Sequence, residues 1–376
     1  MLDTVDIEGL KGVGKVELKF DPDHRVRVLF GVNGVGKTKT LEAIYLGMLF
    51  TQSEFYAAMR SSWIEGKKHT PASSVSIDGV HVLGRYIGDS THQALSDAVP
   101  LGPQHSGPVV FIGAGGRASV AAEPSDAGPL GQFSERKKRH FERLLAEFLS
   151  GNLRSAGMAV DVRAWFVQRA QSVNPYQVEK DNLQNEIDTV LELLNEIDPR
   201  VAAGKLQIDG AQRVFLNVSG DWVELGELSS GFASVVKIFQ AIVAAYSNFT
   251  NAPDVRRMPG VVLIDEVESH LHINWQTTIV GKLKRLFPKT VFVVATHSPL
   301  ILSQLEEGEA YLLARDEDDV VRATIINSPN MKAFGDVLND AFGVDLNGLK
   351  RAALESTDQS AAKKRLLDLL LGEGEE

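Results

Sequence analysis

Apolar and polar residues alternate at the start of the chain. Residues 5–7 and 16–20 place every second side chain on one apolar face, with a glycine-rich turn between the two runs. This period of two predicts half-buried strands joined as a hairpin. Residues 26–30 form a mostly apolar run, which predicts the next strand.

Helical spacing follows, because apolar side chains recur every three or four positions over residues 41–48. Asp78-Gly79 then separates two short runs of alternating valine and isoleucine, a pattern typical of a tight hairpin. Glycine, proline and serine interrupt residues 87–131. We therefore expect irregular chain there, apart from a short strand at residues 109–112.

The pattern between residues 133 and 199 is that of amphipathic helices. The first apolar face comprises Leu144, Leu145, Phe148 and Leu149. A second stripe keeps a four-three spacing for about two heptads and comprises Leu183, Ile187, Val190, Leu194 and Ile197. Two heptads are too few for an extended coiled coil. We expect a compact helical lobe, and a dimer seam is the alternative use of the same stripe.

Four consecutive basic residues occupy positions 136–139, at the start of this helical region. Such a cluster could hold a phosphate backbone. Because Glu135, Glu142 and Glu147 are interleaved with it, a solvated helix face is the preferred interpretation.

Strand patterns return between residues 206 and 223, and we expect these strands to rejoin the core sheet. Continuous apolar runs at residues 261–264 and 291–295 predict two neighbouring, buried strands of a parallel sheet. Helical spacing from Trp275 onwards predicts a helix between them. A later hairpin is expected around residues 316–319, an acidic stretch best interpreted as a solvated turn, and amphipathic helices follow to the end of the chain.

Composition narrows the class of protein. The chain has 376 residues, 44% of them hydrophobic, which is enough for a sizeable core. There is no cysteine, no apolar run near 18 residues and no signal-peptide pattern, so we expect a cytoplasmic protein without a membrane partner. The formal net charge of −10 makes DNA binding by the chain alone possible but weak.

The stretch GVNGVGKT at residues 31–38 fits the phosphate-binding pattern G-x-x-x-x-G-K-[ST], and it lies between a predicted strand and a predicted helix. Its glycines let successive backbone N–H groups face phosphate oxygens at a helix N-terminus. Lys37 would reach the β- and γ-phosphates, and Thr38 would offer its hydroxyl to Mg²⁺. The residues predicted to bind ATP here are Gly31, Asn33, Gly34, Gly36, Lys37 and Thr38.

Adjacent carboxylates end the predicted strand at residues 261–264, where ligands of open α/β sheets bind. Asp265 can hold Mg²⁺ together with Thr38. Glu266 is then free to orient and deprotonate an attacking water. The alternative is an ordinary acidic loop at a strand end.

Two further stretches carry candidate chemistry. LSSGF, residues 228–232, precedes a helical pattern and places Ser229 and Gly231 at a helix N-terminus, which can bind phosphate. His297 ends the predicted strand at 291–295, within reach of a γ-phosphate. A zinc site of His270, His272 and His297 is disfavoured by their spacing. GAGGR at residues 113–117 is interpreted as a turn because it lacks the spacing of a phosphate loop.

Taken in order, GVNGVGKT, LSSGF, VVLIDEVESHLH and ATHSPLIL resemble the ATP-binding-cassette (ABC) type of ATPase. The resemblance is to the RecF-like and OLD-like AAA ATP-binding proteins, which are related to the heads of structural-maintenance-of-chromosomes proteins. It implies an α/β fold: an ABC-type P-loop ATPase head with a mostly parallel core sheet, antiparallel N-terminal strands and an inserted helical lobe. The head would comprise residues 1–132 and 205–376, and the lobe residues 133–204.

The same resemblance implies a dimer that sandwiches ATP, in which Ser229 and Gly231 of one protomer meet the phosphate loop of the other. Asp265 would be the acid linked to Mg²⁺, Glu266 the catalytic carboxylate and His297 the switch histidine. The sequence departs from the family at two positions, with Phe232 in place of Glu or Gln and Val267 in place of Pro.

OLD-like proteins continue into a Toprim nuclease, which needs a second cluster of metal-binding acids that this sequence lacks. The resemblance therefore implies an ATPase without a nuclease domain that acts on a separate effector such as a nuclease. Relatives of this design are often encoded beside nucleases or other toxic effectors in bacterial anti-phage defence. The alternatives are a DNA-repair or DNA-end-binding ATPase and a non-hydrolysing structural ATP binder. Glu266 favours hydrolysis, because a plain binder needs no base.

Overall fold

The computed structural model describes residues 2–61, 72–83, 105–118, 120, 130–150, 153, 157–158, 160–178, 181–250, 252 and 254–331, with isolated positions from 335 to 351. Residues Met1–Asn330 form one compact unit and Met331–Glu376 a second. Every helix and strand named below belongs to the first unit. The helices predicted near the end of the chain lie mostly outside the described residues.

A ten-stranded sheet forms the core of the first unit, in the order β5-β4-β1-β2-β13-β12-β3-β11-β10-β6. Its strands are β1 (Thr4–Leu10), β2 (Gly14–Lys19), β3 (Val26–Phe30), β4 (Ser74–Ile77), β5 (Val80–Leu83), β6 (Val109–Ile112), β10 (Gly260–Ile264), β11 (Thr290–Thr296), β12 (Ala310–Arg315) and β13 (Val320–Ile325).

The pairing within this sheet confirms the predicted fold class. The five strands from β12 to β6 are all parallel to one another, whereas β5, β4, β1 and β2 pair antiparallel. The predicted hairpin around Asp78-Gly79 joins β4 to β5, and Asp78 lies in the left-handed region at φ +51°. Because parallel strands end at the same edge, the chain after β3, β10 and β11 meets at one place.

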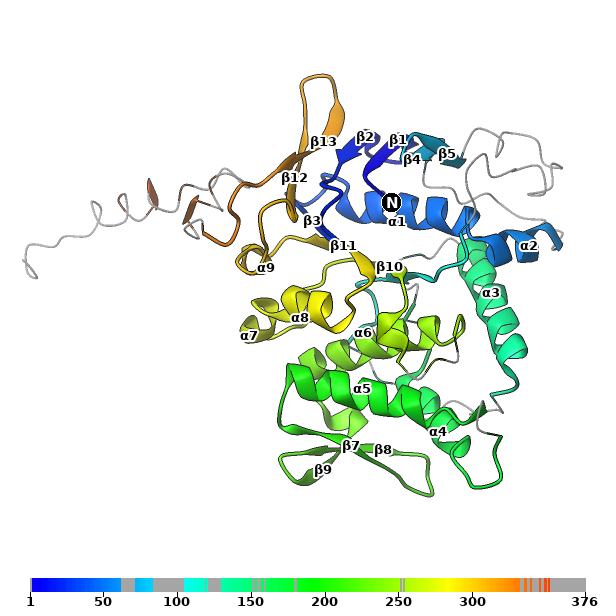
Figure 1. Ribbon diagram of the computed structural model, residues 1–376. Helices are drawn as coiled ribbons and strands as arrows, with labels where there is room; N and C mark the ends of the chain where they lie inside the picture. The colour runs from blue at the N-terminus through cyan, green and yellow to red at the C-terminus, as the bar shows by residue number, and fades with distance from the viewer. Residues whose placement is uncertain are drawn as a thin grey trace, which may run out of the picture. The chain divides into compact units, whose positions relative to one another are not determined.

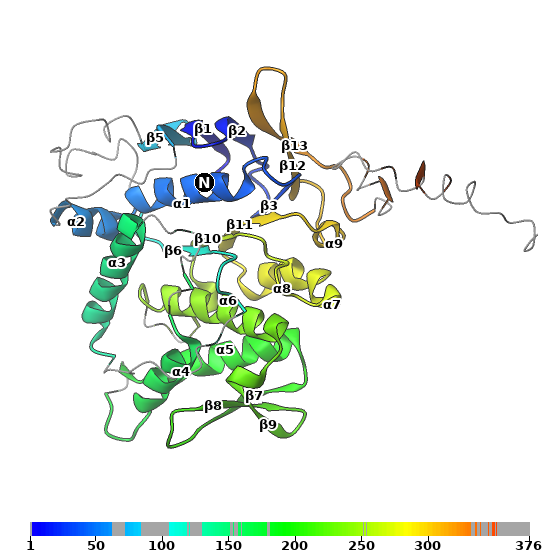
Figure 2. The ribbon, with the colours of Figure 1, turned by 180° about the vertical axis from the view of Figure 1, so that it is seen from behind.

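Two helices cover this parallel region. Helix α1 (Lys37–Phe50) starts seven residues after β3 ends and is buried along almost its whole length. Helix α6 (Ser230–Tyr246) is also almost entirely buried. Figures 1 and 2 show α1 on one side of β6, β10 and β11, and α6 on the other. The site-bearing strands are thus fully covered, which explains their continuous apolar sequences.

The middle of the chain is helical, as predicted. It contains α3 (Phe133–Ser150), α4 (Val162–Gln171) and α5 (Gln184–Ile197), whereas the short α2 (Ser53–Ser61) precedes them. The apolar face of α3 joins the same hydrophobic core as α1 through Phe141, Leu144, Leu145 and Phe148. The division into a head and a lobe at residues 133 and 204 stays a prediction.

The apolar stripe of α5 is not a dimer seam. Its five side chains are buried, with exposed fractions of at most 7%. Helix α5 packs against α6 and against β7 (Val201–Ile208) of the same chain. The stripe therefore stabilises the fold of one protomer, and the alternative interpretation was wrong.

The strands between residues 201 and 224 do not rejoin the core sheet, contrary to expectation. Strands β7, β8 (Val214–Val218) and β9 (Asp221–Glu224) form a separate three-stranded antiparallel sheet. It lies beyond α5 in Figures 1 and 2. Since β7 begins only four residues after α5 ends, its apolar face is covered by that helix instead of by the main sheet.

The helix predicted from Trp275 onwards is divided in two, α7 (Ile273–Gln276) and α8 (Ile279–Leu286). Thr277 and Thr278 lie at the break, and both hydroxyls donate to the carbonyl of Asn274, at 3.0 and 3.2 Å. Side-chain donors of this kind compete with the helical backbone ladder. Further short helical segments before residue 331 are α9 (Pro299–Leu302) and the 3₁₀ turns at Leu225–Glu227 and Val255–Arg257.

Candidate active site

The phosphate loop bends where its glycines allow it. Gly34 and Gly36 have φ of +85° and +108°, which is the left-handed region. A Cβ at Gly36 would come within 2.8 Å of the methyl groups of Val13. Asn33 and Gly34 are exposed at the tip of the loop. The loop is therefore an open backbone cradle at the N-terminus of α1, which suits a phosphate chain.

Lys37 lies across this loop. Its Nζ donates to the carbonyls of Gly31 at 2.7 Å and Val32 at 3.1 Å, which leaves one of its three N–H donors without a partner among the described residues. Burial lowers the pKa of Lys37, while the nearby carboxylates, Glu268 foremost, oppose that shift. The ammonium is thus fixed in place with one donor available to an anion.

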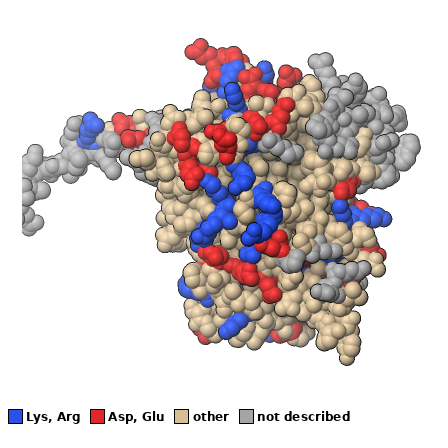
Figure 3. All heavy atoms as spheres, viewed as in Figure 1, with Lys and Arg blue, Asp and Glu red and all other residues tan. Residues whose placement is uncertain are grey.

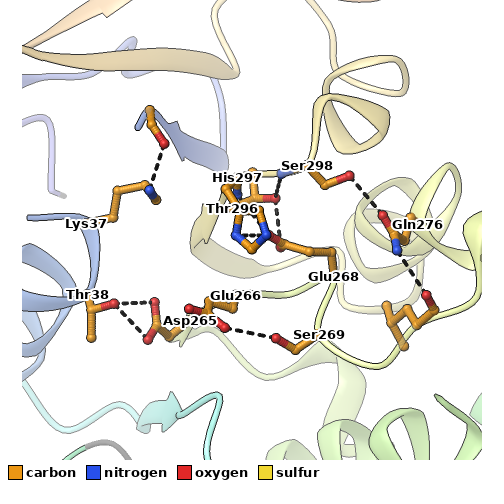
Figure 4. Close-up of polar contacts among 12 residues, drawn as sticks. Lys37, Thr38, Asp265, Glu266, Glu268, Ser269, Gln276, Thr296, His297 and Ser298 are labelled. Carbon is orange, nitrogen blue, oxygen red and sulfur yellow. Dashed lines mark hydrogen bonds and ion pairs between the residues drawn. The ribbon is translucent and has the colours of Figure 1, made fainter. Parts of the chain in front are cut away.

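Asp265 directly follows the C-terminal end of β10, and Thr38 lies in the first turn of α1. The two side chains meet. The Thr38 hydroxyl lies 3.0 Å from both carboxylate oxygens of Asp265 (Figure 4). Hard oxygen donors of this kind are the ligands that Mg²⁺ takes in nucleotide sites. The pair therefore fits the predicted metal site, although its role stays a prediction.

Arg117, in the turn after β6, holds the backbone of Asp265 in place. It is fully buried, donates from Nη2 to the backbone carbonyl of Asp265, and donates from Nε to Gly113 at 3.1 Å. Residues 113–117 thus form a turn, as predicted, with no phosphate-loop geometry. Burial lowers the pKa of Arg117 to about 10, so it remains a cation at neutral pH beside Asp265.

Burial raises the pKa of Asp265 to about 6, opposed by the hydrogen bond from Thr38. A carboxyl whose pKa is higher in the folded state lowers stability as pH rises from about 4 to about 6, by up to about 3 kcal/mol. We expect Asp265→Asn to raise the melting temperature of the metal-free protein at pH 7.5 and to lose this advantage at pH 4. Thermal unfolding at both pH values checks this. An equal effect at both would contradict it.

Glu266 has an unusual backbone for its residue type, with φ of +44°. Left-handed backbone at a non-glycine residue is uncommon and is often found at functional sites. Its Oε2 accepts a hydrogen bond from the Ser269 hydroxyl at 3.0 Å, and the side chain is half-buried. The carboxylate is therefore oriented beside Asp265 but still reachable by a water molecule (Figure 4).

Glu268 is a site residue that the sequence reasoning missed. It is buried, and its carboxylate accepts hydrogen bonds from the Thr296 hydroxyl at 2.7 Å and from the backbone N–H of His297 at 2.8 Å. The same carboxylate lies 2.8 Å from Nδ1 of His297. Because Nδ1 faces Glu268, Nε2 is the nitrogen left for a ligand. The only sequence signal was a third acid after Asp265 and Glu266.

If Glu268 acts by orienting His297, removing either residue should have the same consequence. We expect Glu268→Gln and His297→Ala each to lower ATP turnover by about tenfold or more. The double variant should be no slower than His297→Ala. Steady-state turnover of the three proteins, with ATP affinity and melting temperature as controls, measures this. Additive losses would show that the two residues act separately.

Ser229 caps α6, where its Oγ accepts the N–H of Phe232 at 3.3 Å, and it is exposed. Gly231 is buried, and a Cβ there would lie 2.6 Å from the carbonyl oxygen of His270. No hydrogen bond joins either residue to Lys37 or Thr38 among the described residues of the protomer. This is the arrangement that an interaction in trans requires, and that interaction stays a prediction.

The two departures from the family pattern have structural partners. Phe232 is buried and its ring lies 6.0 Å from that of Trp275. The backbone N–H of Val267 donates to the carbonyl of Ala295 at 3.3 Å, a bond that proline could not make. This bond links the carboxylate loop to β11.

Most side chains of the basic cluster at residues 136–139 lie close to glutamates of the same chain. Arg136 is buried and lies 3.8 Å from Glu186, Lys137 pairs with Glu54 at 2.6 Å, and Lys138 lies 3.7 Å from Glu142. A solvated face is therefore an incomplete description, since Arg136 is not solvated. On the face seen in Figure 3, basic side chains are likewise flanked by acidic ones. The basic side chains gather at the centre of this face, with acidic ones above and below them.

Two further groups of side chains could be considered as metal sites. His270, His272 and His297 do not form a cluster with metal-ligating geometry in the part of the chain that the structure describes. His24, Glu306 and Glu309 do, but Lys284 already lies 2.7 Å from both glutamates. The acidic turn at residues 316–319 is held by Arg322, which pairs with Asp316 and Asp318. Within the described residues, no helix has the length and apolarity to cross a membrane.

Comparison with known proteins supports the resemblance. Residues 130–303 match the family described as "AAA domain, putative AbiEii toxin, Type IV TA system". This match covers Ser229, Asp265, Glu266 and His297 but begins after the phosphate loop. The predicted resemblance to AAA ATP-binding proteins is confirmed.

Three relatives are similar over different lengths. "Septu protein PtuA" of Bacillus thuringiensis is 22% identical over 366 residues, 92% of this chain and 85% of that protein. The protein of the same name from Bacillus mycoides (strain KBAB4) is 34% identical over 28% of this chain and 15% of its own length. "Retron Vc95 probable ATPase" of Vibrio cholerae serotype O1 biovar El Tor is 36% identical over 23% and 16%. The chain thus matches only a small part of the latter two.

A solved structure is also similar: the "SmcHead bound to the C-winged helix domain of ScpA" has a TM-score of 0.45 and 14% identity, covering 87% of this chain and 97% of that one.

Proposed function

We propose that this chain is a Mg²⁺-dependent ATPase that dimerises around ATP and thereby controls a separate effector protein in bacterial antiviral defence. The observation that supports it most is the convergence of Thr38, Asp265 and Glu266 at one edge of the parallel sheet. The role in defence rests on the family resemblance and on the relatives named Septu and retron.

Each residue then has a distinct task. The loop backbone and Lys37 bind the phosphates, and Thr38 with Asp265 would hold Mg²⁺, which supplies positive charge to the phosphate oxygens. Glu266, oriented by Ser269, takes the proton from the attacking water. His297, whose Nδ1 lies 2.8 Å from Glu268, would offer Nε2 to the γ-phosphate.

The fold also explains how hydrolysis could reach an effector. Glu268 connects the end of β11 to the carboxylate loop, and the Ser298 hydroxyl donates to Gln276 at 2.8 Å, while Gln276 donates to the carbonyl of Leu271 at 2.9 Å. A displacement of His297 would therefore reach residues 270 and 271, which lie next to Gly231 at the proposed dimer face. The partner itself is proposed from the resemblance.

Substitution of Ser229 tests whether ATP binding causes dimerisation. We expect the protein to sediment as a dimer with ATP but as a smaller species with ADP, and Ser229→Arg to abolish the ATP-dependent dimer while single protomers still bind ATP. Ser229→Thr keeps the helix cap and is the matched control. Sedimentation velocity gives the result. Unchanged assembly of Ser229→Arg would contradict the sandwich.

A further inference from the structure

A second cavity lies between α3, α4 and the C-terminal end of α6, and it shares no residue with the phosphate loop. Its volume is about 340 Å³. Pockets that hold small ligands start at about 300 Å³. Side chains of Arg136, Arg143, Trp165 and Arg169 line it, with Ala244 at its α6 wall. Because α6 begins at Ser230 and ends at Tyr246, the cavity is at the opposite end of that helix from Ser229.

The lining is strongly cationic. Four guanidiniums, from Arg136, Arg139, Arg143 and Arg169, face one lining carboxylate, Asp161. Asp161 caps α4 by accepting the N–H of residue 163 at 2.9 Å. The positive charge of the residues that line the cavity therefore exceeds their negative charge.

One acid beside the cavity pairs with two of these cations. Glu186 lies 2.9 Å from Arg169 and 3.8 Å from Arg136. Arg139 and Arg143 have no carboxylate oxygen within 4.0 Å among the described residues. Arg143 instead donates to Nδ1 of His140, at 3.2 Å, and Arg139 donates to the backbone carbonyls of residues 130 and 135.

The electrostatics agree with this geometry. Burial lowers the pKa of Arg136 and Arg169, and neighbouring guanidiniums lower both further, while Glu186 opposes the shift. Burial also lowers the pKa of His140 to about 3, so its imidazole is neutral and adds no charge. Cations have thus been gathered where they repel one another, and an anion would relieve that repulsion.

The cavity also holds a buried donor with no acceptor. Trp165 is 1% exposed and lines the cavity, and its indole N–H has no hydrogen-bond partner among the described residues. Buried polar groups are nearly always paired, so this donor, in a residue that lines the cavity, lacks the acceptor that a buried indole N–H normally has. Arg169 lies over the same indole, 4.5 Å from the ring centroid, which holds its guanidinium in place.

We propose that this cavity binds a small phosphate-bearing molecule at a site separate from the ATP site. Guanidinium groups and an indole N–H only donate hydrogen bonds, so the ligand must be rich in acceptors. A guanidinium group can donate two parallel hydrogen bonds to two oxygens of one phosphate, and several guanidinium groups together suit a ligand with more than one negative charge. The volume of this open cavity, about 340 Å³, suits a ligand of mononucleotide size or smaller.

The test uses the full chain carrying Lys37→Ala, so that the phosphate loop does not contribute. Pyrophosphate and 5′-AMP are titrated by calorimetry at low salt. We expect at least one to bind, and Arg139→Ala with Arg143→Ala to weaken binding by about tenfold or more. Both side chains are exposed, so this change should spare the fold, and equal melting temperatures would confirm that.

Lys138→Ala is the matched control, because Lys138 lies on the same helix but does not line the cavity. It should bind the probe as tightly as the parent protein. Binding of pyrophosphate alone would assign the site to a phosphate group without a nucleoside, and tighter binding of 5′-AMP would assign it to a nucleotide. Binding of neither, or an equal affinity for the arginine and lysine variants, would overturn the proposal.

Discussion

Glu266→Gln should lower ATP hydrolysis by about a hundredfold or more, because general-base assistance typically contributes at least that factor. The amide keeps the size of the side chain and can still accept the hydrogen bond from Ser269. It cannot take a proton from water. Mg²⁺ and ATP should still bind, since Thr38, Asp265 and Lys37 are unchanged.

The stalled protein should therefore accumulate as an ATP-bound dimer. Phosphate release measures turnover, and sedimentation with ATP measures assembly. Glu266→Gln combined with Ser229→Arg is the matched control, which should bind ATP without forming the dimer. A Glu266→Gln protein that hydrolyses ATP at the normal rate would show that Glu266 is not the general base, whereas a parent protein that binds ATP without hydrolysing it would be a plain ATP binder.

Lys37→Ala should cause the largest loss of ATP affinity. The residue contributes a charge and the one donor that the loop carbonyls do not occupy. Charge-assisted hydrogen bonds are worth about 1.5–3 kcal/mol each, which corresponds to a loss of about tenfold to a hundredfold, and the lost charge adds to it. Titration with a fluorescent ATP analogue gives the affinity.

Lys39 provides the comparison, because it lies two residues further on and carries the same charge. Its Nζ is 2.6 Å from the buried carboxylate of Glu42, so it points away from the loop and into an ion pair. Lys39→Ala should lower stability, since it leaves that carboxylate without its partner, but should bind ATP nearly as well. Equal losses of affinity in the two variants would show that the loop assignment is mistaken.

Local sequence patterns predicted the elements that build the site. Strands β3, β6, β10 and β11 were each predicted to within two residues at either end, because a strand buried on both faces must be apolar throughout. The phosphate loop was equally clear, since a backbone cradle needs glycine at fixed positions and those positions are adjacent in sequence. The acids after β10 and the histidine after β11 followed from where the strands end.

Tertiary structure alone decided the contacts between distant segments. Glu268 became a partner of His297 only because β10 and β11 are adjacent, and Arg117 reached Asp265 only because β6 lies beside β10. Strands β7 to β9 alternate apolar and polar residues as β1 and β2 do, yet they form a separate sheet in which β7 packs against α5. The spacing of apolar residues shows which face of a strand or helix is buried. It does not show which segment covers that face, because the covering segment is distant in sequence.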